Sequence, residues 1–327
     1  MVEKKGGYWR MLAAVGLVAA LACGCAGGKA AVDHGGELVS EEGQIAFMHA
    51  TSFNGSDIEP DIYTINVDGT AERRLTDTPG LDGFPTWSPD GQRLAFVSDR
   101  DGGGGNWEIY VMDSDGTHQR RLTNTPEDEA ALAWSPDGEK IAYATDGLGT
   151  GPLKDDPYDP SIWVMDADGS DRRRLTDGNW PSWSPDGERI LYQGGTWTVT
   201  RLSVINADGS EQRNLGFNHT WEAAWSPDGE KIAFVSTDGK ENSEDIYTMN
   251  FDGSRRTRLT HIPGDDHWPP TWSSDGTRIA FTSDGTDGIG EIYVMNSDGS
   301  GLTELTHQPP GWLTSDPPVD AFPTWRT

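Results

Sequence analysis

The residues best suited to bind a ligand lie in short segments that each precede a recurring tryptophan. These segments combine carboxylates, aromatic rings and histidines, and they differ from copy to copy while the flanking residues stay alike. Variable segments on a rigid framework are where binding residues usually lie. Aromatic faces beside carboxylates suit a peptide, a cationic group or a sugar. We expect the binding residues to be Asp82, Phe84, Glu129, Trp180, His219, Trp221, Glu222, Asp266, His267, Trp268, Asp320 and Phe322.

Two of these residues also raise the question of metal chemistry. His219 and His267 occupy nearly equivalent segments, and a metal between them would support an alternative function as a metal-dependent sugar lyase or hydrolase. The sequence contains no His-x-x-x-His motif and no His-Glu pair. Asp-x-Asp-Gly segments such as 113–116 partly match a calcium loop, but Asp-Gly is also what a hairpin turn prefers. We therefore expect no metal and no cofactor.

The tryptophans reveal an internal repeat that must position these residues. Trp-Ser-Pro-Asp-Gly, or a close variant, begins at residues 87, 134, 183, 225 and 272, and Trp325 ends a sixth copy. Successive copies are 42 to 53 residues apart. A period of this size indicates a supersecondary unit that buries its apolar face only by stacking on its neighbours.

Each repeat contains four short candidate strands. The first ends in the tryptophan, and a Pro-Asp-Gly turn leads to an apolar triplet such as 94–96. An alternating strand such as 109–112 follows, and an Asp-Gly turn leads to a last strand ending in Leu-Thr, as at 122–123. This pattern predicts four-stranded antiparallel sheets. Six such sheets arranged radially form an all-β, six-bladed β-propeller.

The phase of the repeat predicts how the ring closes. Residues 44–76 supply the second to fourth strands of a repeat but no tryptophan strand before them, whereas the tryptophan strand at 321–326 has no partners after it. We expect this C-terminal strand to join the N-terminal sheet. Closure of this kind leaves no open end in the ring.

The tryptophan motifs, the apolar triplets, the Ile-Tyr-Val-Met strands and the Leu-Thr ends together resemble the TolB-like β-propeller family, with its WD-repeat-like units. The resemblance covers residues 44–326 and extends to the propeller of dipeptidyl peptidase IV-type proteins. It implies that the tryptophan strands are innermost, so that the segments before them surround a central funnel. There they would recognise a protein or peptide, or their rings would simply fill the channel. No Gly-x-Ser-x-Gly nucleophile elbow is present, which favours a non-enzymatic scaffold.

The N-terminal residues predict export and a lipid anchor. Lys4, Lys5 and Arg10 precede a 12-residue apolar run that is short for a membrane span, followed by small residues and two cysteines. We expect a lipoprotein-type signal peptide at 1–22, lipidation at Cys23 (or Cys25), a flexible tether at 23–43 and the propeller at 44–327. The protein would then be a membrane-anchored component of the cell envelope or periplasm.

The charge of the chain limits its partners. The formal net charge is −28, from 53 acidic and 25 basic residues. Such a surface repels phosphate backbones, which excludes nucleic acid, and it attracts cationic groups. We expect a monomer that binds a protein or peptide of the cell envelope, with a membrane contact only through its lipid.

Overall fold

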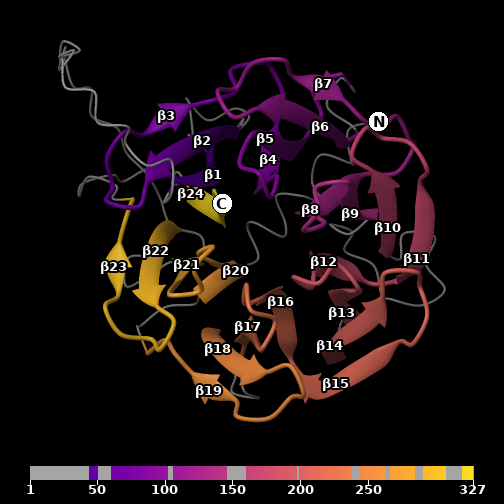
Figure 1. The fold of residues 1–327 in the computed structure, drawn as a ribbon. Coiled ribbons are helices and arrows are strands. Elements are labelled where there is room, and N and C mark those ends of the chain that lie inside the picture. Colours follow the sequence, from indigo (N-terminus) through magenta and orange to yellow (C-terminus); the bar gives the residue numbers. More distant parts are fainter. Residues whose placement is uncertain are drawn as a thin grey trace.

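The structure, a computed structural model, describes residues 44–50, 60–101, 106–145, 160–196, 199–237, 244–261, 266–283, 290–306 and 319–326. These residues form six four-stranded antiparallel blades arranged in a ring (Figure 1). The predicted six-bladed β-propeller is therefore confirmed. The predicted signal peptide, the tether and both cysteines lie outside the described residues. No helix long and apolar enough to cross a membrane occurs in the part of the chain that is described.

The strands of blades 2 to 6 run outward from the axis in chain order, whereas blade 1 has the last strand of the chain innermost. Blade 1 contains β24 (Val319–Trp325), β1 (Gln44–Ala50), β2 (Asp61–Asn66) and β3 (Arg73–Arg74), and blade 2 contains β4 (Asp82–Trp87), β5 (Arg93–Ser98), β6 (Glu108–Asp113) and β7 (Arg120–Arg121). Blade 3 contains β8 (Glu129–Trp134), β9 (Lys140–Thr145), β10 (Ser161–Asp166) and β11 (Arg173–Asp177), and blade 4 contains β12 (Asn179–Trp183), β13 (Arg189–Thr196), β14 (Val199–Asn206) and β15 (Arg213–Asn218). Blade 5 contains β16 (Thr220–Trp225), β17 (Lys231–Ser236), β18 (Asp245–Asn250) and β19 (Thr257–Arg258), and blade 6 contains β20 (Asp266–Trp272), β21 (Arg278–Ser283), β22 (Glu291–Asn296) and β23 (Thr303–Glu304).

The Ser-Pro-Asp-Gly motif closes the turn between the first two strands of a blade. In blade 2, the Ser88 hydroxyl donates to Asp90 Oδ1 at 2.6 Å and accepts from the Arg93 backbone N–H at 2.9 Å. Gly91 takes a left-handed φ of 63°, and its N–H donates to the Ser88 carbonyl. Serine and aspartate thus form the hydrogen bonds that hold the turn, and glycine adopts a backbone conformation that residues with a side chain disfavour.

The Leu-Thr ends join the two outer strands of a blade. The Thr123 hydroxyl accepts the Ile109 backbone N–H at 2.8 Å, and the equivalent threonine hydroxyls of blades 1, 5 and 6 accept the corresponding isoleucine N–H. The Asp-Gly turns before these strands are hairpin turns, since the Asp115 carboxylate accepts the backbone N–H and the hydroxyl of Thr117. This agrees with the hairpin interpretation of the Asp-x-Asp-Gly segments.

The tryptophans hold neighbouring blades together. Trp134 of blade 3 donates its indole N–H to the Thr86 carbonyl of blade 2 at 3.3 Å, and the Arg93 guanidinium of blade 2 lies 4.9 Å from the Trp134 ring centroid. The middle strands are mostly buried, and the side chains of Leu94 and Phe96 have no exposed surface. Because each apolar face is buried only by the next blade, the ring is the unit of stability.

The C-terminal strand closes the ring as predicted. β24 pairs antiparallel with β1, with Ile45 opposite Trp325. Trp325 donates its indole N–H to the Thr271 carbonyl of blade 6 at 3.2 Å, so one strand contacts blades 1 and 6. Figure 1 shows β24 beside the axis with the other innermost strands, β4, β8, β12, β16 and β20.

Candidate functional site

A bulge in each innermost strand directs one residue toward the axis. In β4 the register with β5 shifts between Gly83 and Thr86, and Phe84 takes a φ of 52°. A β-bulge changes the direction of a side chain, and a bulky residue in the left-handed region is uncommon. The third residue before the tryptophan has positive φ in five blades, namely Phe84, Ala131, Trp180, Glu222 and Phe322.

Three of these residues close the channel on its axis. The Phe84 ring centroid lies 4.2 Å from that of Phe322 and 5.7 Å from that of Trp180, and the Trp180 and Phe322 rings stack with their centroids 5.8 Å apart. Phe84 and Phe322 are buried, whereas Trp180 keeps part of its surface exposed. We call these three residues, which come from blades 2, 4 and 1, the aromatic plug.

The channel continues beyond the aromatic plug as a cavity of about 170 Å³. All six blades line it, through the plug and the residues that follow in each innermost strand: Pro85, Thr86, Leu132, Ala133, Pro181, Ser182, Ala223, Ala224, Pro270, Thr271, Pro323 and Thr324. The lining holds no charged side chain. The cavity therefore offers apolar surface and a few hydroxyls.

Blade 5 carries polar residues at and just before the bulge of its innermost strand. Glu222 is half-buried and occupies the axial bulge position next to that of Trp180 in blade 4. His219 is exposed just before β16, and its backbone N–H donates to the Thr200 carbonyl. Trp221 is half-buried and packs on the core between blades 5 and 6. Trp180 and Glu222 hold the same bulge position in adjacent blades, and His219 precedes Glu222 by three residues. We call these three residues, which offer an aromatic ring, a carboxylate and an imidazole, the axial mouth.

Asp82 is fully buried rather than displayed at the funnel. Arg100 Nη2 donates to both of its carboxylate oxygens at 2.8 Å, and the guanidinium lies over the rings of Phe96 and Tyr110. Burial raises the pKa of Asp82 above its ordinary value, against the opposing effect of the hydrogen bond from Arg100. Asp82 therefore links the start of β4 to Arg100, which follows β5 in the same blade, and it is not accessible to solvent.

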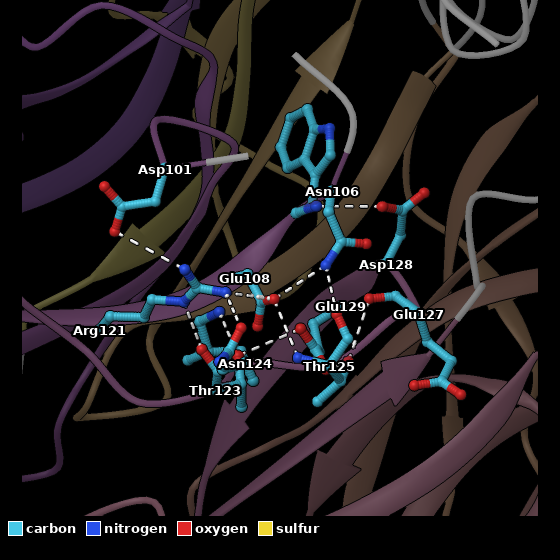
Figure 2. A network of polar contacts seen from close by, with 12 residues as sticks. Asp101, Asn106, Glu108, Arg121, Thr123, Asn124, Thr125, Glu127, Asp128 and Glu129 are labelled. Carbon is cyan, nitrogen blue, oxygen red and sulfur yellow. Dashed lines mark hydrogen bonds and ion pairs between the residues drawn. The ribbon is translucent and has the colours of Figure 1, made fainter. Parts of the chain in front are cut away.

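Glu129 is also fully buried, in the network shown in Figure 2. It begins β8 and accepts hydrogen bonds from the hydroxyls of Thr125 at 2.7 Å and Thr123 at 3.1 Å. Across the blade boundary lies Glu108, which is 2% exposed and pairs with Arg121 at 2.6 Å. Burial, and then the charge of Glu108, raise the pKa of Glu129 to about 8. Sequence reasoning placed this carboxylate at the funnel surface, but the ring encloses it.

The remaining predicted residues lie in β20 and β24, where the backbone is described but the side chains are not. Asp266 pairs with Ser283 and Asp320 pairs with His49, which is the register that Asp82 has with Ser98. Asp266 and Asp320 therefore occupy the position of Asp82 in their blades. His267 and Trp268 follow Asp266, and β20 has a longer bulge than the other innermost strands, with three residues opposite Phe281. The alternative in which His219 and His267 hold a metal is not tested by these backbone positions. Among the described residues no cluster of three or more metal-ligating side chains occurs.

Sequence reasoning missed the residues that support the plug and the buried carboxylates. Trp107 is 7% exposed and its ring centroid lies 6.0 Å from that of Phe84. A Cβ atom at Gly83 would lie 3.3 Å from Trp107 Cζ3, so glycine leaves room for this contact. Glu108 and Arg100 were also missed. A signal existed for Glu108, since an acidic residue precedes the isoleucine of the third strand at Asp61, Glu108, Asp245 and Glu291.

Comparison with known proteins places these features in context. The model of the family described as TolB beta propeller domain matches residues 44–221 and 154–317. A protein TolB homolog of Chlorobium luteolum is 47% identical over 51 residues, which make up 16% of this chain and 11% of that protein. The crystal structure of TolB from Acinetobacter baumannii has a TM-score of 0.71 at 18% identity, over 87% of this chain and 66% of that one. An oligogalacturonate lyase from Vibrio parahaemolyticus has a TM-score of 0.53 at 17% identity, over 79% of this chain and 73% of that one, a likeness of fold alone.

Proposed function

Because this chain belongs to the TolB beta propeller domain family, we propose that it is a non-enzymatic binding module of the cell envelope. Its ligand is a protein or peptide held at the axial mouth. A lipid on Cys23 (or Cys25) anchors it to a membrane, after removal of the signal peptide 1–22, and residues 23–43 form the tether to the propeller of 44–327. The resemblance to the periplasmic TolB protein supports the envelope location.

The observation that carries the proposal is the shared left-handed backbone at the axis. Phe84, Trp180, Glu222 and Phe322 have φ values of 52°, 53°, 35° and 56°. A non-glycine residue in a sparsely populated region costs on the order of 1–3 kcal/mol, and such residues cluster at functional sites. The same conformation recurs in five blades at one position of the innermost strand, and at four of the five it carries a large or charged side chain, the exception being Ala131.

The axial mouth suits a cationic side chain on a peptide. An aromatic face attracts a cation through its quadrupole, and a carboxylate attracts it directly. The half-exposed Trp180 and the carboxylate of Glu222 provide both on adjacent blades. The formal charge of −28 would steer a basic partner toward the protein. The aromatic plug closes the channel below, so the ligand would rest on the plug instead of passing through.

The test is capture of envelope proteins by the full chain purified from detergent-solubilised membranes. Two variants change the axial mouth, Trp180→Ala and Glu222→Gln. Each has a matched control elsewhere: Leu302→Ala, at an exposed apolar residue, and Glu211→Gln, at an exposed carboxylate. We expect the natural chain and both controls to retain the same partner protein. Each mouth variant should retain at least about tenfold less of that protein, as for a central interface residue.

Equal retention by the natural chain and both mouth variants would refute the proposed site. Thermal melting of each variant separates a lost contact from a lost fold. Retention of the partner in the presence of a chelator is also expected, because no step of this recognition uses a metal.

The alternative, a metal-dependent sugar lyase or hydrolase, depends on the location of the two histidines. His219 lies exposed before β16, and His267 lies in the neighbouring innermost strand β20. This alternative predicts that the chain retains a stoichiometric divalent metal after dialysis and that His219→Ala loses it. Metal analysis of both proteins decides the question, since equal and negligible metal content in both would exclude the histidine pair as a metal site.

A further inference from the structure

We propose that Glu108 and Glu129 share a single proton and that this pair is a pH-sensitive latch between blades 2 and 3. The inference concerns the joint between two blades and is independent of what the axial mouth binds. Glu108 begins β6 of blade 2 and Glu129 begins β8 of blade 3 (Figure 2). The side chains of Glu108 and Glu129 are 3% and 0% exposed, so water does not solvate a second negative charge.

The first argument is the count of donors around Glu108. Its Oε1 atom accepts from Arg121 Nη2 at 2.6 Å, from the Asn106 side-chain amide at 2.8 Å and from the Thr125 backbone N–H at 3.0 Å. Its Oε2 atom is buried and accepts no hydrogen bond from any described residue. A buried acceptor without a donor is unfavourable, because it has lost its water without replacement.

The second argument is that Glu129 can supply the missing donor. Thr125 and Thr123 donate to its two oxygens, and Thr125 also donates its backbone N–H to Glu108 Oε1, so that one residue bridges the two carboxyl groups. An ionised Glu129 would place an acceptor against an acceptor. A protonated Glu129 carries an O–H, which can donate to Glu108 Oε2 and satisfy it. One proton between the two carboxyl groups therefore completes the network, as in other carboxyl pairs at close range.

The arginines near the pair do not carry enough positive charge to stabilise both carboxyl groups in the ionised form. In the described part of the chain two cations form ion pairs with these carboxyl groups, Arg121 from β7 with Glu108 and Arg172 from the segment before β11 with Glu129. Arg121 is shared between Glu108 and Asp101, and Arg172 lies 3.5 Å from Glu129 while its Nε donates to the Tyr143 hydroxyl. Tyr143 stays neutral, since its pKa is raised to about 12 by burial.

Two further carboxylates lie on the loop that carries Glu129. Glu127 is exposed, and Asp128 accepts the Trp107 backbone N–H at 3.0 Å. Both add negative charge to the surroundings of the pair, which disfavours a second ionised carboxyl. The contact of Asp128 also connects the carboxyl pair to Trp107, which packs on Phe84 of the aromatic plug. The Glu129 backbone N–H in turn donates to the Trp107 carbonyl at 2.9 Å.

The direction of the pH effect follows from the raised pKa of Glu129. Its pKa of about 8 in the folded protein exceeds its ordinary value of 4.5, so the folded state binds more protons between these limits. The stability that the proton contributes is therefore fully present below the ordinary pKa and is lost as the pH rises through about 8. Above that pH, the two charges repel across the blade boundary, and the joint that supports Trp107 loosens.

The test compares thermal melting of the full chain from about pH 6 to about pH 9.5. We expect the melting temperature of the natural chain to fall by about 2–4 °C per pH unit up to pH 8 and to level off above it. Glu129→Gln keeps an N–H donor for Glu108 Oε2 and should abolish this fall. Glu127→Gln makes the same charge change two residues away at an exposed position, and should keep the fall.

A second measurement keeps the proposal testable if Glu129→Gln folds poorly. The infrared carbonyl band of a protonated carboxyl group should be present in the natural chain at neutral pH and disappear between about pH 7 and about pH 9. Absence of that band at neutral pH would overturn the proposal. The proposal would also be overturned if Glu129→Gln folds and its melting temperature falls with pH as much as that of the natural chain.

Discussion

Replacing Arg326 with alanine is expected to weaken the closure of the ring. Arg326 follows β24, is 9% exposed, and its Nε donates to the Gly91 carbonyl of blade 2 at 2.9 Å. Its guanidinium also lies 5.1 Å from the Trp87 ring centroid. At two other blade boundaries the first residue of a second strand takes this place, Arg93 over Trp134 and Arg278 over Trp325. Blade 1 has Gln44 there, and Arg326 supplies the missing cation.

The expected cost follows from these contacts. A hydrogen bond to a charged group contributes about 1.5–3 kcal/mol, and a desolvated cation–π contact contributes about 2 kcal/mol. Releasing the arginine side chain returns about 2 kcal/mol of rotamer entropy. Arg326→Ala should therefore lower the free energy of unfolding by about 2 kcal/mol, which corresponds to roughly 4 °C in the melting temperature of a domain this large.

Arg93→Ala is the matched control, because its guanidinium makes the same ring contact at a boundary where the chain continues from one blade to the next. It should cost only about 1 kcal/mol. Thermal melting and urea unfolding of both variants provide the comparison. If Arg326→Ala melts at the same temperature as Arg93→Ala, the C-terminal residue adds nothing special to closure and the reasoning fails.

Two further predictions concern the buried residues around the axis. Phe84→Ala removes the central ring of the aromatic plug and should lower the free energy of unfolding by about 3–5 kcal/mol, measured by urea unfolding. The fluorescence emission of Trp180 should shift to the red, and an unchanged spectrum would mean that the plug does not exclude water. Asp82→Asn leaves the Arg100 guanidinium without its carboxylate in a buried position and should cost about 3–5 kcal/mol, whereas Asp82→Asn combined with Arg100→Met should recover part of this loss. A double variant less stable than Asp82→Asn alone would contradict that account.

Much of the fold was predictable because the information is local and repeated. The Ser-Pro-Asp-Gly turn satisfies itself within six residues, as the contacts of Ser88 with Asp90 and Arg93 show. The strand order and the closure by β24 followed from the count and phase of the repeats. Both predictions are confirmed, as is the resemblance to the TolB-like propellers.

The candidate site was less predictable, since the environment of each side chain depends on the neighbouring blade. Phe84 and Phe322 are 238 positions apart in the sequence, yet their rings touch because both lie at the axis. Glu222 lies in a β-bulge that the residues of its own strand do not predict. The binding role of the twelve residues stays a prediction, and the capture experiment tests it at Trp180 and Glu222.

The amino-acid sequence by itself determined the number of blades, their strand order and the turns that connect them, because hydrogen bonds within a hairpin link residues close in the chain. Only the tertiary structure decided which carboxylates are exposed. Asp82 and Glu129 have the sequence context of surface-loop acids, but both are fully buried where one blade meets the next. Burial is a property of the closed ring, and with it come the pairing of Asp82 with Arg100 and the raised pKa of Glu129 beside Glu108.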